Sequence, residues 1–333
     1  MIINMTYLIY FLVMVLAMNF YFRIADRFNI IDKPNLRSSH SKITLRGGGI
    51  IFYFGALLWF IQSGFAYPWF FLALTGISLI SFVDDIKPVS RRLRLGIHLV
   101  SMLLLFNQLG LFSGPYLYIL IALIVATGIL NAYNFMDGIN GITGVYSLAV
   151  LSCLWIINNN LVNFIQNDFL YFVGLALLVF NFYNSRRKAK CFAGDVGSVS
   201  IAFILLFLLG KLIIQTEDFS YLILLAVYGV DSVITIIHRL ILKENIFDAH
   251  RKHLYQILAN ECSIPHTIVS GSYALLQFIL FAGFMIFSDQ GIMVRSVYFW
   301  SQVLFLSLVY IYLKNRYYHL HVKNLKINTN KKS

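Results

Sequence analysis

Apolar runs long enough to cross a membrane occupy most of this chain, and they constrain its fold more than any other feature. A spanning helix needs roughly 17–25 predominantly apolar residues to cross a hydrocarbon core about 30 Å thick. Only 12% of the 333 residues are charged, whereas a soluble domain typically carries about 25%. The sequence therefore predicts an all-α polytopic membrane protein with about eleven transmembrane helices, near residues 4–22, 47–64, 67–83, 95–112, 116–133, 142–158, 168–184, 198–215, 219–238, 267–288 and 292–313.

Lysine and arginine are concentrated in alternate loops, and this distribution predicts the orientation of the chain. With eleven spans, 24 of the 26 basic residues fall on one side, and only Lys211 and Arg295 fall on the other. Because cytoplasmic loops carry the excess of positive charge, we expect the N-terminus outside and the C-terminus in the cytoplasm. The net charge of +12 then reflects loops beside anionic membrane lipids, and no nucleic-acid partner is expected. The basic segments are 23–46, 84–94, 185–197, 239–266 and 314–333.

The chain shows no internal repeat, and we expect one polytopic domain at residues 1–313 with its site on the cytoplasmic face. Residues 314–333 form a basic cytoplasmic tail, and we expect its last part, "KNLKINTNKKS", to be disordered. The first apolar run is not typical of a cleaved signal peptide, because no Lys or Arg precedes it. Neither a disulfide nor a cysteine metal site is expected, since the three cysteines form no CxxC pair.

The predicted cytoplasmic loops carry most of the chemistry-bearing side chains. Four aspartates, Asp84, Asp85, Asp137 and Asp195, lie where a span meets such a loop. Carboxylates at a membrane boundary are costly when they are half-desolvated, so four on one face suggest a shared partner. The simplest partner is Mg²⁺, with Mn²⁺ as the alternative, because hard oxygen ligands suit these ions and substrate phosphates complete the shell.

Each of these segments also has a purely structural interpretation when it is taken alone. "DDIKP" is compatible with a solvated helix end, "GDVGS" with a helix cap, and "NAYNFMDGINGITG" with a glycine-rich turn. The three glycines of "RGGG" permit either close approach to a ligand or close helix packing. Taken together, carboxylates, glycine-rich turns, Lys42, Arg46 and two histidines on one face indicate phosphoryl transfer to or from a lipid-borne reactant.

Five segments, in order, resemble the polyprenyl-phosphate N-acetylhexosamine-1-phosphate transferase family. They are "SHSK…RGGG", "VDD", "NAYNFMDGINGITG", "AGDVGS" and "HRKHLYQ", and they extend from about residue 32 to residue 256. The resemblance implies a Mg²⁺- or Mn²⁺-dependent enzyme of the bacterial cytoplasmic membrane. It would transfer a sugar-1-phosphate from a UDP-N-acetylhexosamine to undecaprenyl phosphate, release UMP, and thereby initiate O-antigen or another surface polysaccharide. The resemblance leaves open whether the protein forms a homodimer.

The resemblance also implies roles for individual residues. Asp195 is the expected metal ligand, with Asp85 as a second, and Asp84 and Asp85 match paired aspartates of which one is proposed to activate the lipid phosphate. His250 and His253 are the other expected catalytic residues. The residues expected to bind substrate are Lys42, Arg46, Asn134, Asp137 and Arg251.

The sequence departs from the family pattern at two places. Asn140 stands where many members carry a second aspartate, which weakens any metal role for this position. "HRKHLYQ" stands where the peptidoglycan enzyme has a denser histidine cluster. This motif favours the branch of the family that transfers N-acetylated deoxyhexosamines, and N-acetylglucosamine is nearly as well supported. The muramoyl-pentapeptide transferase reaction is an alternative.

Two functions of other classes also stay open. One is a secondary transporter, for which Asp231 within the ninth span is the only candidate group. The other is a lipid-binding scaffold, which leaves the clustered carboxylates unexplained. For the transferase, direct attack of the lipid phosphate on the β-phosphorus and a two-step route through an aspartyl-phosphate are both compatible with the sequence.

Overall fold

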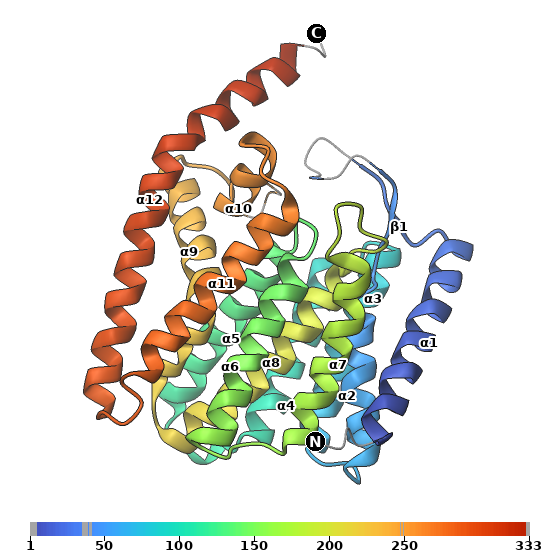
Figure 1. Ribbon diagram of the computed structural model, residues 1–333, viewed down its shortest axis with the longest axis vertical. Helices are drawn as coiled ribbons and strands as arrows, with labels where there is room; N and C mark the ends of the chain where they lie inside the picture. Colours follow the sequence, from blue (N-terminus) through green and yellow to red (C-terminus); the bar gives the residue numbers. More distant parts are fainter. Residues whose placement is uncertain (1–4, 35–38, 40–41, 247, 249, 331–333) are drawn as a thin grey trace.

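The fold is a bundle of long helices, seen in a computed structural model that describes residues 5–34, 39, 42–246, 248 and 250–330, with side chains as far as residue 322 (Figure 1). A short antiparallel pairing of β1 (Ile31–Asp32) with β2 (Thr44–Leu45) precedes the second helix. The long helices are α1 (Met5–Arg27), α2 (Ile50–Gln62), α3 (Pro68–Ile86), α4 (Arg91–Gln108), α5 (Tyr116–Met136), α6 (Ile142–Asn160), α7 (Asn167–Asn184), α8 (Gly194–Thr216), α9 (Ala226–Ile241), α11 (His266–Met285) and α12 (Ile292–Asn330). The short ones are η1 (Leu111–Ser113), η2 (Phe219–Leu225), α10 (Leu254–Gln256) and the π-helical η3 (Ile257–Glu261).

Every predicted apolar run coincides with a helical segment, the ninth being η2 followed by α9. In the described part of the chain, eight segments are long and apolar enough to cross a membrane, counting η2 and α9 together. The apolar helix α2 has only 13 residues, and α4 carries three arginines in its first turn. The all-α membrane class is therefore supported, whereas the number of eleven spans and the orientation stay predictions.

Helix α8 forms the centre of the bundle. Its sequence is apolar all round, which is the pattern of a helix buried on every side, and 78% of its most apolar window is buried. The corresponding share of α12 is only 6%, and Figure 1 shows α1 and α12 on the outside of the bundle. The N-terminus of α8 thus lies at a fixed position among the surrounding helix ends.

The glycines of "RGGG" serve close packing rather than a ligand. A Cβ on Gly49 would lie 2.2 Å from the Cα of Gly197, so the start of α2 packs directly on α8. A Cβ on Gly48 would lie 2.6 Å from the sulfur of Cys191. Gly47 has a φ of +77°, a conformation that side chains other than that of glycine rarely adopt.

The end of the bundle that carries β1, β2 and α10, called the site end below, gathers the polar segments (top of Figure 1). Helices α3 and α5 end there and α8 begins there, so Asp84, Asp85, Asp137 and Asp195 meet although they are far apart in sequence. This confirms the prediction that these aspartates share one face of the bundle.

The structure differs from one prediction about the C-terminus. Disorder was expected for "KNLKINTNKKS", residues 323–333, whereas α12 continues without a break to Asn330. The division between a domain and a basic tail at residue 313 stays a prediction. All three cysteines are free.

Candidate active site

Asp85 joins the end of α3 to the beginning of α8. Its Oδ1 accepts a hydrogen bond from the backbone N–H of Asp195 (2.9 Å), and its Oδ2 accepts one from the N–H of Val196 (3.0 Å). The first N–H groups of a helix have no partner within the helix, and the positive end of the helix dipole favours a carboxylate. Because the Asp85 side chain has no exposed surface, it acts as the buried anchor for the start of α8.

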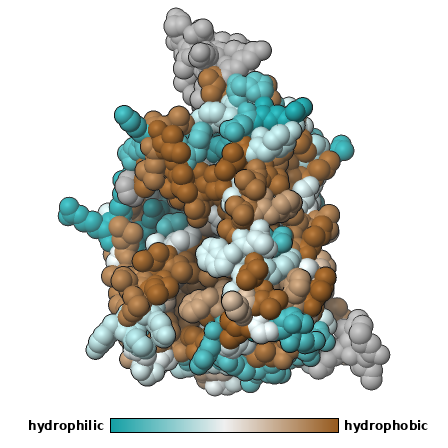
Figure 2. All heavy atoms as spheres, turned by 90° about the vertical axis from the view of Figure 1, so that its left-hand side faces the viewer, coloured by the Kyte–Doolittle hydropathy of each residue, from teal (hydrophilic) through white to brown (hydrophobic). Residues whose placement is uncertain are grey.

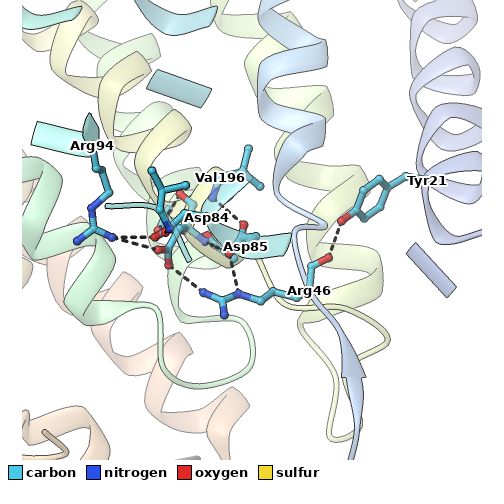
Figure 3. A network of polar contacts seen from close by, with 10 residues as sticks. Tyr21, Arg46, Asp84, Asp85, Arg94 and Val196 are labelled. Atoms are coloured by element: carbon cyan, nitrogen blue, oxygen red, sulfur yellow. Dashed lines mark hydrogen bonds and ion pairs between the residues drawn. The ribbon is translucent and has the colours of Figure 1, made fainter. Parts of the chain in front are cut away.

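Arg46 bridges two of the carboxylates (Figure 3). Its Nε lies 2.6 Å from Oδ1 of Asp85, and its Nη2 lies 3.2 Å from Oδ1 of Asp195. The hydroxyl of Tyr21 donates to the carbonyl oxygen of Arg46 (2.5 Å), which ties this loop to α1. Burial opposes the charge of Arg46, but the neighbouring carboxylates, Asp85 first, outweigh it and raise the pKa of the guanidinium. Arg46 is therefore a fixed cation of the site.

Asp84 and Arg94 form the other side of the cluster (Figure 3). Oδ1 of Asp84 accepts the backbone N–H of Val89 (2.7 Å), and its Oδ2 lies 2.8 Å from Nη1 of Arg94. The same Nη1 is 3.9 Å from Oδ2 of Asp195. Asp195 is thus held between two guanidinium groups, while both oxygens of Asp84 are engaged by the turn that joins α3 to α4.

A polar cavity of about 230 Å³ lies next to this cluster. It is bounded by the end of α5, the start of α8, the loops around β1 and β2, and the segment before α11. Asp137 and Asp195 both line it, together with Arg46 and Asn134. The complete lining is Asp32, Ser39, Arg46, Asn134, Asp137, Gly138, Ile139, Asn140, Asn184, Phe192, Gly194, Asp195, Gln256 and His266.

Asp137, at the end of α5, is a carboxylate of this cavity with a raised pKa. Burial raises its pKa to about 7, the hydroxyl of Thr143 lowers it, and the charges of Asp195 and Asp85 raise it further. The Thr143 hydroxyl donates to Oδ1 of Asp137 over 2.7 Å. Without a cation nearby, Asp137 is therefore close to half protonated at neutral pH.

Asn140, at the position where the family resemblance led us to expect a second aspartate, has a structural role. Its Nδ2 donates to the backbone carbonyl oxygens of Arg186 (2.8 Å) and Arg187 (3.4 Å). Its own carbonyl oxygen accepts from the Ser270 hydroxyl (2.8 Å), and the residue is 5% exposed. A carboxylate here would face two carbonyl oxygens with no proton to donate. The amide thus joins the α5–α6 turn to the loop after α7.

The histidine segment, residues 250–261, is fixed by Asp231 of α9. Oδ1 of Asp231 lies 3.0 Å from Nδ1 of His253 and accepts the backbone N–H of Leu254 (3.2 Å). Its Oδ2 accepts the hydroxyl of Tyr273 (2.7 Å) and the N–H of Tyr255 (3.4 Å). An aspartate bonded to Nδ1 holds an imidazole in one orientation and leaves Nε2 able to bond to, or exchange a proton with, another group. Nε2 of His253 is buried and has no hydrogen-bond partner among the residues that the structure describes.

Asp231 is therefore not the exposed ion site that a transporter would need. It is 2% exposed, and its carboxylate accepts bonds from the histidine segment, Tyr273 and Thr235 (3.3 Å). The described structure offers no observation that favours transport through this residue. Asp231 borders the site by positioning His253.

An apolar groove of about 850 Å³ reaches the site end between α5, η2, α9 and α12. His250 and Phe135 line the groove, and the ring centroids of His250 and His253 are 5.0 Å apart. Burial lowers the pKa of His250 to about 3, with further lowering by nearby positive charges. Asn131 and Phe135 of α5 face the groove, whereas Asn134 and Asp137 face the polar cavity. The end of α5 therefore separates the two spaces.

Figure 2 shows that this side of the molecule is mainly hydrophobic, with hydrophilic side chains gathered toward its ends.

Two predicted binding residues lie outside the cavity. Lys42 is exposed in the loop before β2, and its carbonyl oxygen accepts from the Thr44 hydroxyl (3.2 Å). Arg251 pairs through Nη2 with Oε1 of Glu261 (3.1 Å). The structure brings together Arg46, Asn134, Asp137 and Asp195 as predicted, and places His250 and His253 behind the end of α5.

Sequence reasoning missed Arg94, Gln256 and His266 as site residues. Arg94 lies in the "RRLR" run, where nothing in the sequence distinguishes it from its exposed neighbours. Gln256 and His266 both line the cavity, on either side of η3 in the chain. Gln256 is the last residue of the histidine motif, and His266 follows that motif within a short distance.

The donor set fits a hard divalent cation that is completed by substrate. Asp195 and Asp137 line one cavity and offer carboxylate oxygens, which Mg²⁺ prefers. Among the described residues, no three His, Cys, Asp or Glu side chains are grouped closely enough to hold an ion alone. Mg²⁺ usually binds through one or two carboxylates plus substrate phosphates and water. Asp137, rather than the buried Asp85, stands beside Asp195 in this cavity.

Fold and site together define the class of the protein. It is an α-helical membrane protein of many spans with an acidic and basic cluster at its helix ends, between a polar cavity and an apolar groove. Such a pairing suits a reaction between a polar phosphorylated molecule and a lipid.

Comparison with known proteins agrees with this class. The profile of glycosyl transferase family 4 matches residues 67–213, which contain Asp84, Asp85, Asp137 and Asp195. The probable undecaprenyl-phosphate N-acetylglucosaminyl 1-phosphate transferase of Bacillus subtilis (strain 168) is 25% identical over 320 residues, which cover 88% of this chain and 85% of that protein. The undecaprenyl-phosphate alpha-N-acetylglucosaminyl 1-phosphate transferase of Escherichia coli (strain K12) is 27% identical over 278 residues, 74% of each chain. The five motifs predicted this family, and both the profile match and the relatives support that prediction.

Proposed function

We propose that this protein transfers an N-acetylhexosamine 1-phosphate from a UDP-sugar to undecaprenyl phosphate, giving undecaprenyl-pyrophosphate-sugar and UMP. The observation that carries the proposal is the pair of spaces on opposite faces of the end of α5. One is polar and lined by carboxylates and Arg46, and the other is apolar and open along the helices. The printed names of the relatives describe the same acceptor and the same kind of transfer.

The polar cavity is the proposed site of the UDP-sugar. Asp195 and Asp137 would hold Mg²⁺, or alternatively Mn²⁺, which would offset the charge of the pyrophosphate and of the departing UMP. Arg46 offers a guanidinium that is 34% exposed, and guanidinium groups bind phosphate oxygens through paired hydrogen bonds. Asn134 and Gln256, the residue of the histidine segment that lines the cavity, would contact the nucleotide or the sugar.

The apolar groove is the proposed site of the undecaprenyl chain. Its lining is almost wholly aliphatic and aromatic, and its end at the site contains Asn131 and His250. Each CH₂ group moved from water into such a surface contributes about 0.8 kcal/mol. A lipid chain in this groove would bring its phosphate to the end of α5, next to the cavity that holds the donor.

The proposed chemistry is a single in-line displacement at the β-phosphorus. An oxygen of the lipid phosphate forms the new bond to this phosphorus, and the bond to the bridging oxygen breaks, so that UMP leaves with the electron pair. A phosphate monoester has its second pKa near ~6 and is largely dianionic at neutral pH, so no residue has to remove a proton. Positioning then supplies most of the rate.

The contacts of the paired aspartates argue against an aspartyl-phosphate. Both oxygens of Asp84 are engaged by Val89 and Arg94, and the Asp85 side chain has no exposed surface. A nucleophile needs a free oxygen directed at the substrate. We therefore propose that Asp85 anchors α8 and that Asp84 holds Arg94 beside Asp195.

The proposed location is the bacterial cytoplasmic membrane, with the site facing the cytoplasm. In the sequence, 24 of the 26 basic residues fall in the segments predicted to lie on one side of the membrane, which supports this orientation by the positive-inside rule. The sugar is proposed to be N-acetylglucosamine, because the relatives carry this sugar in their names. An N-acetylated deoxyhexosamine is the second candidate sugar. The identity of the transferred sugar would indicate whether the enzyme initiates O-antigen or another surface polysaccharide.

A direct assay tests this proposal. Purified protein is given undecaprenyl phosphate, Mg²⁺ and, in turn, UDP-N-acetylglucosamine, UDP-N-acetylgalactosamine, a UDP-N-acetyl-deoxyhexosamine and UDP-N-acetylmuramoyl-pentapeptide, and UMP release is measured. We expect release that depends on both the lipid and the divalent cation and that stops with a chelator. Absence of UMP with every donor, with Mg²⁺ or Mn²⁺ present, would overturn the proposal.

A further inference from the structure

The last part of α12 is packed against the histidine segment, although the rest of this helix is mostly exposed. Along one stripe, Tyr310, Lys314 and His321 are 3%, 4% and 2% exposed. The spacing of 4 and 7 residues places them on one face of a helix. Burying lysine and histidine side chains is costly unless they are paired, so their partners indicate what this face is for.

Lys314 connects α12 to the Asp231 network. Its Nζ donates to the hydroxyl of Tyr310 (2.7 Å) and lies 3.4 Å from Oγ1 of Thr235. The Thr235 hydroxyl also contacts Oδ1 of Asp231 (3.3 Å), the same oxygen that lies 3.0 Å from Nδ1 of His253. A chain of hydrogen bonds therefore leads from α12 through α9 to the buried histidine.

His321 holds the opposite end of the histidine segment. Its Nδ1 lies 3.0 Å from Oε1 of Glu261, the last residue of η3, and the same oxygen accepts from Nη2 of Arg251 (3.1 Å). The side chains of Glu261 and His321 are 1% and 3% exposed. Both ends of residues 250–261 are thus fastened to α12 or to a residue that α12 contacts.

A third contact lies between these two. Nζ of Lys252 forms an ion pair with Glu244, which also pairs with Nε of Arg239 at 3.2 Å. The same Nζ lies 5.8 Å from the ring centroid of Tyr318, on the α12 stripe. The ring of His238 meets Tyr318 edge-on at 4.8 Å.

We propose that residues 310–321 of α12 form a brace that positions the histidine segment for the transfer reaction, with Lys314 and His321 as its positioning residues. The inference rests on the proposed function only for its kinetic consequence. The brace concerns only which side chains hold residues 250–261 in place. With this brace, the segment of α12 beyond residue 313 belongs to the catalytic unit.

The test compares buried positions of the brace with exposed neighbours on the same helix. His321→Ala is matched with His319→Ala, and Lys314→Met with Arg316→Met, because His319 and Arg316 are exposed. Hydrogen exchange of residues 250–261 and steady-state UMP release are measured for each protein. We expect faster exchange and a kcat lowered by up to about 10²-fold in the brace variants, since small misplacement of catalytic groups has effects of this size.

Further readouts separate positioning from general damage to the fold. The KM for the UDP-sugar should change less than kcat, because Gln256 is the one cavity residue of this segment, whereas Arg46, Asn134 and Asp195 lie on other elements. His321→Gln, which keeps a donor for Glu261, should recover most of the activity that His321→Ala loses. Unchanged exchange of residues 250–261 in both brace variants would overturn the proposal, and so would equal effects at His319 and His321. If the unmodified protein releases no UMP, the proposed function fails and the exchange comparison still decides the brace.

Discussion

At the scale of single residues, Asp195 is the carboxylate on which the site converges. It lies between Arg46 and Arg94, and its backbone N–H is held by Asp85, so its position is fixed from three sides. We predict that Asp195→Asn lowers UMP release by roughly 10²-fold or more, because one fixed charge at the reacting phosphates is lost. Asp289→Asn, an exposed change at the opposite end of the bundle, serves as the control. Near-normal turnover of Asp195→Asn would contradict the assigned metal role.

Asp137 gives the site a predictable dependence on pH. Its pKa in the folded protein is raised to about 7 from 3.8, so the stability it contributes is present below the unfolded value and is lost as pH rises through about 7. A cation must displace this proton, so the apparent affinity for Mg²⁺ should rise between about pH 6 and about pH 8. The measurement is the Mg²⁺ concentration for half-maximal UMP release at each pH. Asp137→Asn should flatten this dependence, and an unchanged slope would argue against Asp137 as a ligand.

Asn140 tests whether the departure from the family pattern is structural. In Asn140→Asp, the carboxylate would face the carbonyl oxygens of Arg186 and Arg187 inside a nearly closed site. Leaving such buried groups without partners costs about 1–3 kcal/mol. We expect a lower free energy of unfolding, measured by thermal or denaturant unfolding in detergent. Asn159→Asp on an exposed helix end is the control, and an equal or higher stability of Asn140→Asp would refute this interpretation.

These residues also show what the sequence could and could not reveal at this scale. The four boundary aspartates and Arg46 were predicted from residue type and position, because carboxylates are rare at a membrane surface unless they have a partner. The role of Asn140 could not be predicted, since its bonding partners are backbone carbonyls that lie 46 and 47 residues further along the chain. Arg94 was missed for a similar reason. Its ion pair with Asp84 depends on the turn between α3 and α4, which the sequence does not reveal.

At the scale of elements, the apolar runs predicted the position of every long helix. This works because a helix in a membrane must bury nearly all of its length in apolar surroundings, and its sequence records that length. The histidine segment gave no such signal. It folds as a short helix and a π-helix because Asp231 accepts the backbone N–H groups of Leu254 and Tyr255, and that contact comes from another element.

Helix α5 allows a test of the groove at this scale. Gly128 lines the groove, and a Cβ added there would meet nothing within 4 Å, so Gly128→Leu fills the groove without a clash. Losing contact with only two CH₂ groups, at about 0.8 kcal/mol each, corresponds to roughly a ten-fold weaker binding. We expect a higher KM for undecaprenyl phosphate and little change for a short prenyl phosphate. Gly96→Leu on the exposed face of α4 is the matched control, and equal KM values in both variants would exclude the groove as the lipid site.

At the scale of the whole molecule, the two ends of the bundle differ in chemistry more than in shape. The site end carries the aspartate cluster, the histidine segment and nearly all of the basic residues that the structure describes, and the other end consists of short turns. Sequence reasoning assigned this difference correctly because charge and loop length are local properties. It did not predict the buried contacts of Lys314 and His321, and it expected disorder at residues 323–333, where α12 instead continues to Asn330.

The orientation of these two ends in the membrane yields the last prediction. Single cysteines are introduced at Asp289, exposed in the turn between α11 and α12, and at Lys188, exposed in the loop after α7 at the site end. Because the basic end should face the cytoplasm, a maleimide that cannot cross membranes should label Asp289→Cys in intact cells and Lys188→Cys only after permeabilisation. The native Cys153 and Cys191 are buried, and the partly exposed Cys262 is replaced by serine in both variants to keep the background low. Labelling of Lys188→Cys in intact cells would reverse the orientation and place the site outside, where it could not meet a cytoplasmic UDP-sugar.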